Sequence, residues 1–235
     1  MRNAGYLLIA MAAFGANGNA AMASEANRLT VVELFQSQGC SSCPPANANV
    51  MKLSDRPDVL TLSFQVTYWD KLGWKDTFGS KANTERQWDY ARAFHRTNVF
   101  TPEVVVNGTA DAVGVDSNEL DGLVHKAQAS KETVPLTIAN NTVRIGDGDG
   151  GARPAQVWLV RYNPNIVQVP IARGENSGRT LPHKNVVMEL RELGEWTGRS
   201  QTFDLPPASQ SGLRDAVLVQ DGKGGAILAA ARVVS

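Results

Sequence analysis

The two cysteines of the chain, Cys40 and Cys43, are separated by two residues and are the only thiols in the 235-residue sequence. Thiols at this spacing can close a disulfide, but so short a loop removes little entropy from the unfolded chain and adds little stability. Small exported domains that depend on disulfides for stability carry several dispersed cysteines. We therefore interpret the pair as a redox-active Cys-x-x-Cys motif whose value is chemical.

Two other interpretations of the cysteine pair stay open: an inert local disulfide, and part of a copper or zinc site. A structural zinc site takes four ligands, usually two Cys-x-x-Cys pairs or cysteines together with closely spaced histidines. The histidines of this chain are not paired at ligand spacing: His95, His125 and His183. Redox chemistry without a metal or another cofactor is therefore the favoured interpretation.

The segments on either side of the pair predict a strand that runs directly into a helix. Residues 30–35 are β-branched and apolar, as in a buried strand, and residues 36–39 provide a turn. Pro44 and Pro45 suit the first helical turn, where backbone N–H groups have no partner, and residues 46–53 are compatible with a helix. The cysteines are thus expected at the N-terminus of a helix.

This expected helix N-terminus would stabilise a thiolate and lower the pKa of a cysteine, through its free N–H groups and its dipole. In that geometry we expect Cys40, farther out on the turn, to be the attacking thiol. Cys43, partly covered by the helix, would resolve the mixed disulfide. Ser41 and Ser42 supply hydroxyl groups that could stabilise the thiolate.

Predicted strands and helices alternate through the rest of the first half of the chain. In order they are a buried strand at 58–66, a helix at 80–98, a Thr-Pro step and a strand ending in the Asn-Gly turn at 107–108, a strand at 110–115, and a helix capped by Ser117. An aromatic-rich insertion follows the second strand. Most of its rings are expected in the core, with Trp69 and Trp74 as exposed exceptions that could hold a partner.

Beyond Ser130 the pattern changes to short β-rich runs separated by turn residues. Examples of these runs are residues 134–138, 142–145, 155–160, 166–169 and 185–190. Their spacing predicts an antiparallel sheet or a small sandwich that packs on the first half. We therefore expect two domains, at residues 24–131 and 132–235.

The N-terminus has the three parts of a secretory signal peptide. One basic residue, Arg2, precedes an apolar stretch at residues 6–14, and small residues follow up to Ala23. The apolar stretch is shorter than the roughly 20 residues that a membrane-spanning helix needs. Residues 1–23 are therefore predicted to be a signal peptide that is cleaved after Ala23, which places the mature protein in the periplasm or outside the cell.

Composition argues against several classes of partner. The chain has 23 basic and 23 acidic residues, so it lacks the net charge that favours nucleic acid or an anionic lipid surface. The part after the signal peptide contains no apolar run long enough to cross a bilayer. The sequence specifies no oligomeric state.

The order of predicted elements over residues 29–130 resembles the thioredoxin fold. That resemblance implies an α/β architecture in which a central mixed sheet is flanked by helices. It also implies that Pro102 is a cis-proline facing the disulfide, and that Thr101 before it donates backbone hydrogen bonds to a bound substrate.

A set of longer motifs is similar to the exported, thioredoxin-like bacterial family named domain of unknown function 1223. The similar segments are residues 31–35 with 37–46, 68–70 with 72–76, 84–87, 101–102 with 105–108, 173–176 with 178–180, and 185–187. The family pattern has Gln in place of Glu103, and His and Asp where this chain has Gln65 and Thr67. A polar change beside the disulfide would alter proton transfer to or from Cys43.

The polar segment at residues 173–185 supplies possible auxiliary site residues, because polar loops commonly carry function. Arg173 and Arg179 could bind a carboxylate, or hold the loop by pairing with Glu175. His183 could transfer a proton near the disulfide, although the default expectation for it is a surface position.

Together these features predict an exported thiol–disulfide oxidoreductase that exchanges disulfides with proteins or small thiols through Cys40 and Cys43. The serines between the cysteines, the two tryptophans of the insertion and the Thr-Pro step would form the substrate groove. The alternatives are a non-catalytic thioredoxin-like binding protein and a copper- or zinc-handling thiol protein.

Overall fold

The computed structural model describes residues 29–129, 134–150 and 153–233, so the predicted signal peptide lies outside the described residues. No helix in these three ranges is long and apolar enough to cross a membrane. In chain order the elements are β1 (Thr30–Gln36), α1 (Cys43–Leu53), β2 (Val59–Gln65), η1 (Asp70–Leu72), α2 (Lys81–Ala93), β3 (Glu103–Val106), β4 (Ala110–Ala112), α3 (Ser117–Gln128), β5 (Leu136–Ala139), β6 (Thr142–Ile145), β7 (Ala155–Asn163), β8 (Val167–Pro170), β9 (Thr180–His183), β10 (Val186–Trp196), β11 (Gln201–Asp204), β12 (Arg214–Gln220) and β13 (Ile227–Arg232).

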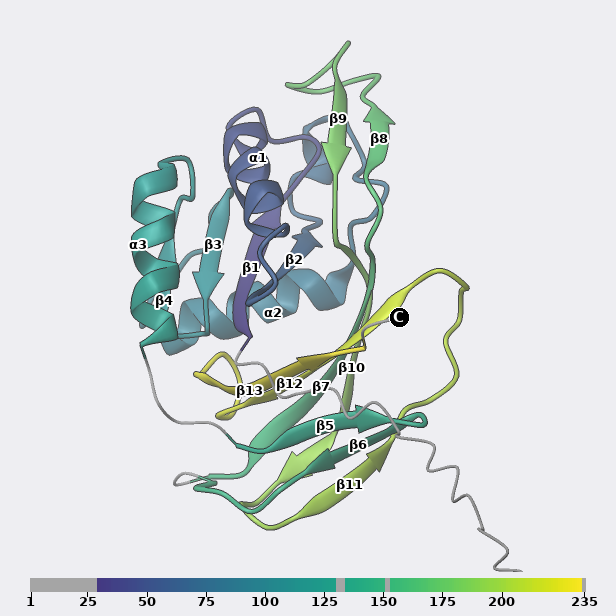
Figure 1. The fold of residues 1–235 in the computed structure, drawn as a ribbon. Helices are drawn as coiled ribbons and strands as arrows, with labels where there is room; N and C mark the ends of the chain where they lie inside the picture. The colour runs from purple at the N-terminus through teal and green to yellow at the C-terminus, as the bar shows by residue number, and fades with distance from the viewer. Residues whose placement is uncertain (1–28, 130–133, 151–152, 234–235) are drawn as a thin grey trace, which may run out of the picture.

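One mixed eight-stranded sheet runs through the molecule in the order β13-β12-β7-β10-β2-β1-β3-β4 (Figure 1). β1 and β2 are parallel, whereas β3 pairs antiparallel with β1 and β4 antiparallel with β3. α1 and α3 pack on the face that carries Val32 and Leu34, and α2 packs on the face that carries Val31 and Phe35. The predicted α/β class, a central mixed sheet with flanking helices, is confirmed.

The predicted order of strands and helices in the first half is present, but two helix boundaries differ. The helix expected to run to residue 98 ends at Ala93, because His95 adopts a left-handed backbone conformation with φ of 57°. The last helix is capped by Asp116 and not by Ser117. The extended backbone of Asp116 lets its carboxylate accept hydrogen bonds from the N–H groups two and three residues on.

The β-rich half continues the same sheet. β10 joins β2 in parallel where Val186 pairs with Ser63, beside a hydrogen bond from the Ser63 N–H to the Asn185 carbonyl (2.9 Å). β7, β12 and β13 then extend the sheet with antiparallel neighbours. The main sheet therefore contains strands from both sides of residue 131, and the division into two domains there stays a prediction.

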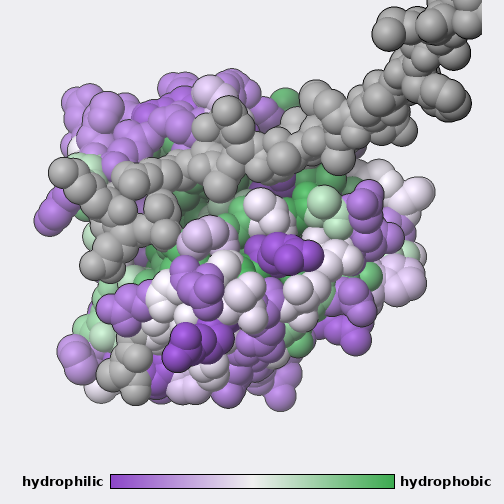
Figure 2. Space-filling view, turned by 60° about the horizontal axis from the view of Figure 1, so that its bottom comes forward, coloured by the Kyte–Doolittle hydropathy of each residue, from purple (hydrophilic) through white to green (hydrophobic). Residues whose placement is uncertain are grey.

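Two smaller sheets accompany the main one. β11, β6 and β5 form an antiparallel sheet that shares a core with β7 and β12, including Val143, Val157 and Val217 (Figure 1). Figure 2 looks at the molecule from this side and shows apolar residues gathered near the centre with hydrophilic residues around them. β8 and β9 form a two-stranded antiparallel arm beside α1, at the opposite end of the molecule (Figure 1).

Candidate functional site

The two cysteines form a disulfide in the turn between β1 and α1, with their Cα atoms 5.5 Å apart. α1 begins at Cys43 and has proline in its first turn, as the sequence predicts. Ser41 and Ser42 are exposed, and Ser42 Oγ lies 3.3 Å from Cys40 Sγ. Cys40 is 0% and Cys43 1% exposed, so the expectation that Cys40 lies farther out is wrong.

Cys40 is buried because a loop from the second half of the chain lies over the turn. This cover loop, residues 171–179, connects β8 and β9. Asn176 in the loop is fully buried, and its Nδ2 donates to the carbonyl oxygens of Gln38 (2.9 Å) and Cys40 (2.9 Å). Arg179 donates from Nη1 to Asn176 Oδ1 (2.7 Å), which fixes the orientation of the amide. The cover loop is thus hydrogen-bonded directly to the cysteine turn.

A second contact of the cover loop is made by Glu175, whose Oε2 accepts a hydrogen bond from the backbone N–H of Ser41 (3.0 Å). Hydrogen bonds from the side chain and the backbone of Ser41 lower the pKa of Glu175, so it is a carboxylate at neutral pH. The predicted pairing of Glu175 with an arginine is wrong. Arg179 binds Asn176 instead, and Arg173 is exposed.

The insertion between β2 and α2 holds the other side of the turn. Gln38 accepts hydrogen bonds through Oε1 from Trp74 Nε1 (2.9 Å) and from the N–H of Thr77 (3.1 Å). The N–H of Gln38 donates to Asp76 Oδ2 (2.7 Å). Burial raises the pKa of Asp76 to about 6, although backbone hydrogen bonds work in the opposite direction. A buried carboxyl group therefore fixes the residue two positions before Cys40.

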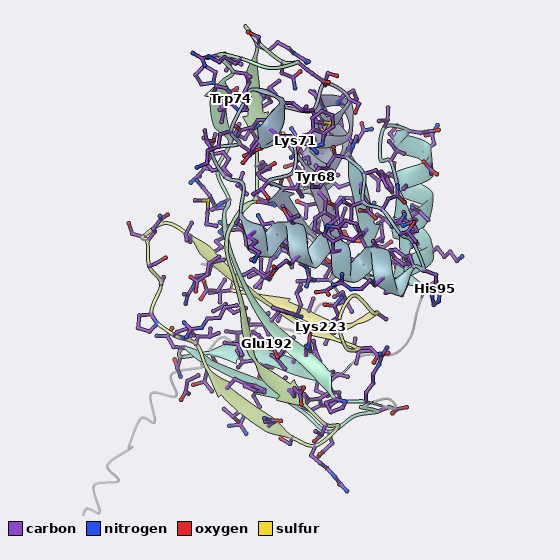
Figure 3. All side chains as sticks on the ribbon, turned by 180° about the vertical axis from the view of Figure 1, so that it is seen from behind. Tyr68, Lys71, Trp74, His95, Glu192 and Lys223 are labelled. Atoms are coloured by element: carbon purple, nitrogen blue, oxygen red, sulfur yellow. A yellow bond between two sulfur atoms is a disulfide. The ribbon has the colours of Figure 1, made fainter. Side chains whose placement is uncertain are left out.

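Both tryptophans that the sequence predicts to be exposed are half-buried. Trp69 packs against the main core, and Trp74 packs against a small apolar cluster formed with the β8–β9 arm. Figure 3 shows Trp74, Lys71 and Tyr68 at the end of the molecule that carries this arm. An exposed aromatic platform is therefore not present, because Trp74 is used to hold Gln38.

The peptide bond between Thr101 and Pro102 is cis, as the resemblance implies. Pro102 directly precedes β3, whose first residue, Glu103, pairs with Phe35 near the end of β1. The Thr-Pro step therefore lies at the same end of the sheet as the C-terminal end of β1, where the cysteine turn begins. Its predicted contact with substrate stays a prediction.

Of the three positions that differ from the expected family pattern, Thr67 is hydrogen-bonded to Thr84 through its N–H (3.0 Å), and the other two lie on opposite faces of the sheet. Glu103 is buried on the α2 face, where Gln87 Nε2 donates to it (2.6 Å) and Arg96 pairs with it. Burial raises the pKa of Glu103, partly offset by these two neighbours. Gln65 is buried on the α1 face, where it and Gln36 both donate to Ser63 Oγ (3.1 and 2.7 Å). Of the two changes, Gln65 is the one on the face of the cysteine helix.

A pocket of about 400 Å³ lies between α1 and β9, beside the cysteine turn. Of the two cysteines, only Cys43 lines it. The remaining wall residues are Gln36, Ser37, Pro44, Asn47, Ala48, Met51, Lys52, Asp55, Ile166, Leu181, Pro182, His183 and Lys184. The wall is mostly apolar, and its charged residues come from the ends of α1 and β9.

His183 is buried in the pocket wall, contrary to the default expectation of a surface position. Its side chain packs edge-on against Phe78, with ring centroids 6.3 Å apart. Neither ring nitrogen has a hydrogen-bond partner among the described residues. Burial lowers the pKa of His183 to about 4, so the imidazole is neutral at pH 7. Its predicted role in proton transfer stays a prediction.

Three residues that hold the cysteine turn are missing from the predicted site: Gln38, Asp76 and Asn176. All three lie in segments that carry the family resemblance, but their residue types alone do not indicate a contact with a disulfide. Asn176 is 136 residues away from Cys40 in the chain, so no local pattern connects them. Only their place in the motifs shared with the family could have drawn attention to these positions.

Metal ligation was the second interpretation of the cysteines. Over the three described ranges, no group of three or more His, Cys, Asp and Glu side chains is arranged to hold a metal ion.

The fold and the site define a mixed α/β protein in which a disulfide at a helix N-terminus is covered by a loop from a distant part of the chain. The chain belongs to the family described as protein of unknown function DUF1223, whose sequence model matches residues 31–220. The family predicted from the motifs is thereby confirmed. No curated protein sequence matches the chain.

Solved structures that are similar to this chain include the following two. A crystal structure of a protein from Agrobacterium tumefaciens shares 33% sequence identity with it, with a TM-score of 0.70 over 87% of this chain and 93% of that chain. The protein HBP35 of Porphyromonas gingivalis shares 13% identity, with a TM-score of 0.53 over 88% of this chain and 75% of that chain. The second likeness concerns the fold alone.

Proposed function

We propose that this protein is a thioredoxin-like thiol–disulfide oxidoreductase of the periplasm or the extracellular space. The observation that carries the proposal is the disulfide between the only two cysteines, in the turn that leads into the N-terminus of α1. The order β2-β1-β3-β4 with helices on both faces, and the Thr-Pro step at the same sheet edge, support the thioredoxin-like assignment.

The proposed reaction is a two-step exchange. A partner thiolate attacks one sulfur of the Cys40–Cys43 disulfide, the S–S bond breaks, and the other cysteine leaves as a thiolate. The N-terminus of α1 stabilises that negative charge. A second thiolate then attacks the partner sulfur, so two thiols are oxidised to one disulfide while the pair takes up two electrons and two protons. The reverse sequence, starting from the reduced pair, reduces a partner disulfide and restores the Cys40–Cys43 disulfide.

The proposed compartment follows from the predicted signal peptide at residues 1–23. An oxidising space would allow the disulfide to form and persist. N-terminal sequencing of the protein recovered from the periplasm should then begin at Ser24.

A redox titration of the mature protein tests the proposed function. The protein is equilibrated in buffers of varied reduced-to-oxidised glutathione ratio, and its free thiols are counted by alkylation and intact-mass measurement. We expect a reversible two-electron transition within the range of biological thiol buffers, with Cys40→Ser and Cys43→Ser lacking it. A disulfide that stays closed in the folded protein at every ratio would make the pair a structural cross-link.

A further inference from the structure

The two sulfurs of the disulfide have different surroundings, although both are buried. On the Cys40 side, the cover loop closes over the turn through Asn176 and Glu175. On the Cys43 side, the pocket between α1 and β9 reaches the cysteine. A molecule that reaches the disulfide through the pocket therefore meets Cys43 first.

Charge also bears on what the pocket can bind. On the Cys40 side, Glu175 places a carboxylate against the Ser41 N–H and Arg179 places a guanidinium against Asn176, so both signs of charge are present. The pocket wall contains Lys52, Lys184 and Asp55, and Lys184 Nζ pairs with Asp55 Oδ1 (2.9 Å). The three charges sum to one positive charge on the pocket side. An incoming thiolate, which is itself negative, is thus attracted to the pocket wall.

The size and lining of the pocket limit what can enter it. A volume of about 400 Å³ accommodates a small organic molecule but not a folded protein. Its wall offers apolar contacts from Ala48, Met51 and Leu181, and polar groups from Asn47 and His183. The two ring nitrogens of His183, a residue of this wall, are buried and have no partner in the part of the chain that the structure describes, and such groups normally require one. A ligand with a short apolar body and a polar or anionic end fits these surroundings.

We propose that the pocket is the entry site for a small anionic thiol, and that this thiol attacks Cys43 rather than Cys40. This inference rests on the function proposed above and names its substrate class and the sulfur attacked. The thiolate RS⁻ bonds to Cys43 Sγ, the S–S bond breaks, and Cys40 leaves as a thiolate. Ser42 Oγ, 3.3 Å from Cys40 Sγ, can donate a hydrogen bond to that thiolate.

The reduction of the protein disulfide is completed by a second molecule of the same thiol. A second RS⁻ attacks the sulfur of R in the mixed disulfide with Cys43, which releases RSSR and the Cys43 thiolate. Two small thiols lose two electrons, and the protein disulfide gains them. The protons that leave the thiols reach the two cysteines through the solvent.

The first test compares single-cysteine variants of the mature protein. Alkylation by iodoacetamide and mixed-disulfide formation with the disulfide of 2-mercaptoethanesulfonate are followed by intact mass. We expect Cys43 in Cys40→Ser to react at least about tenfold faster than Cys40 in Cys43→Ser, because access limits the second reaction. Adding Asn176→Ala to Cys43→Ser should raise the Cys40 rate several-fold, since it removes the hydrogen bonds of the cover loop.

The second test blocks the pocket in the protein that keeps both cysteines. Ala48→Trp places a bulky side chain in the pocket and should slow reduction by 2-mercaptoethanesulfonate about tenfold. Ala82→Trp is the matched control, because Ala82 is also an exposed helical alanine but does not line the pocket. Its rate should equal that of the unmodified protein.

The third test addresses the charge of the thiol. The unmodified protein should be reduced faster by 2-mercaptoethanesulfonate, an anion, than by cysteamine, a cation, once rates are corrected for the thiolate fraction of each. Lys52→Gln removes the net positive charge of the pocket wall and should abolish this preference. A preference that survives in Lys52→Gln would remove the charge argument.

The outcomes separate this inference from the proposed function. Faster reaction at Cys40 than at Cys43, or equal rates for Ala48→Trp and Ala82→Trp, would overturn the pocket as the entry site while the glutathione titration still showed exchange. Capture of whole proteins on Cys40 of Cys43→Ser would instead favour a protein substrate on the cover-loop side. If the titration shows no exchange, the proposed function fails, and the inference fails with it.

Discussion

The buried polar cluster around Glu33 and the polar groups around the disulfide differ in how completely they are paired. In the Glu33 cluster, Arg86 donates to both carboxylate oxygens of Glu33 (2.6 and 3.1 Å) and to Gln220 (3.2 Å). Tyr90 also donates to Glu33. Around the disulfide, His183 and Gln65 keep buried atoms that have no partner among the described residues.

This difference in pairing distinguishes a structural cluster from a candidate reactive site. A buried charge with a full set of partners is a structural element, and here it ties α2 and β1 to β12 of the second half. The disulfide has a pocket on one side and a loop on the other. Changes in the Glu33 cluster should therefore affect folding, whereas changes at the disulfide should affect reactivity first.

The largest expected effect is the loss of stability on removing the cation of the Glu33 cluster. Arg86→Met leaves Glu33 buried without its countercharge, and we expect a loss of about 3–5 kcal/mol in the free energy of unfolding. Urea denaturation followed by circular dichroism measures it. Arg92→Met is the control, because Arg92 lies on the same helix in a surface pair with Asp89 and should change stability by less than about 1 kcal/mol.

A loss equal to that of Arg92→Met would contradict the comparison, because the cluster would then not behave as a desolvated ion pair. A full loss of folding would agree with it. In that case Arg86→Lys gives the measurable intermediate, since it keeps the charge but not the two-point contact with the carboxylate.

The next effect concerns His183 and depends on pH. The pKa of His183 is lowered to about 4 in the folded protein, from 6.5 in the unfolded chain. Between these values the unfolded chain binds more protons, so stability falls as the pH falls from 6.5 towards 4. His183→Gln cannot take up this proton. Its stability should therefore fall less over the same window, with a difference on the order of 3 kcal/mol.

The pKa shift of Asp76 has the opposite effect on how stability depends on pH. Its pKa is raised to about 6 in the folded protein, so the folded state takes up a proton below pH 6 and gains stability relative to the unfolded chain. Asp76 is present in both proteins, and its effect cancels in the difference between them. His125→Gln, at an exposed histidine, should follow the unmodified protein. Parallel curves for His183→Gln would show that His183 is not held neutral.

Local sequence patterns were sufficient for the elements that carry the cysteines. The run of β-branched residues at 30–35 and the prolines after Cys43 predict β1 and the start of α1, because both depend on neighbouring residues. The burial of Cys40 could not be predicted in this way. It depends on Asn176, which belongs to the β8–β9 arm and contacts the turn from a distant part of the chain.

Local sequence patterns also could not predict that the two halves of the chain share one sheet. The short β-rich runs beyond residue 134 predict strands correctly, but antiparallel runs of this kind can form a separate sheet or extend an existing one. In this protein the runs extend the existing sheet, and the junction is at Asn185. Its φ is 52°, and its carbonyl oxygen accepts a hydrogen bond from the Ser63 N–H. Neither feature is visible as a sequence period.

The smallest expected effect separates a paired tryptophan of the insertion from an unpaired one. Trp74→Phe removes the hydrogen bond from Nε1 to Gln38 Oε1 (2.9 Å), whereas Nε1 of Trp69 has no partner within the described residues. Both substitutions remove a similar ring volume from half-buried positions. Trp74→Phe should therefore cost about 1 kcal/mol more than Trp69→Phe in the free energy of unfolding measured by urea denaturation.

The same pair of variants should differ in the reactivity of Cys40. Because Gln38 precedes Cys40 by two residues, Trp74→Phe should also speed alkylation of Cys40 in Cys43→Ser, and Trp69→Phe should not. Equal stabilities and equal rates would mean that the insertion packs beside the cysteine turn without holding it.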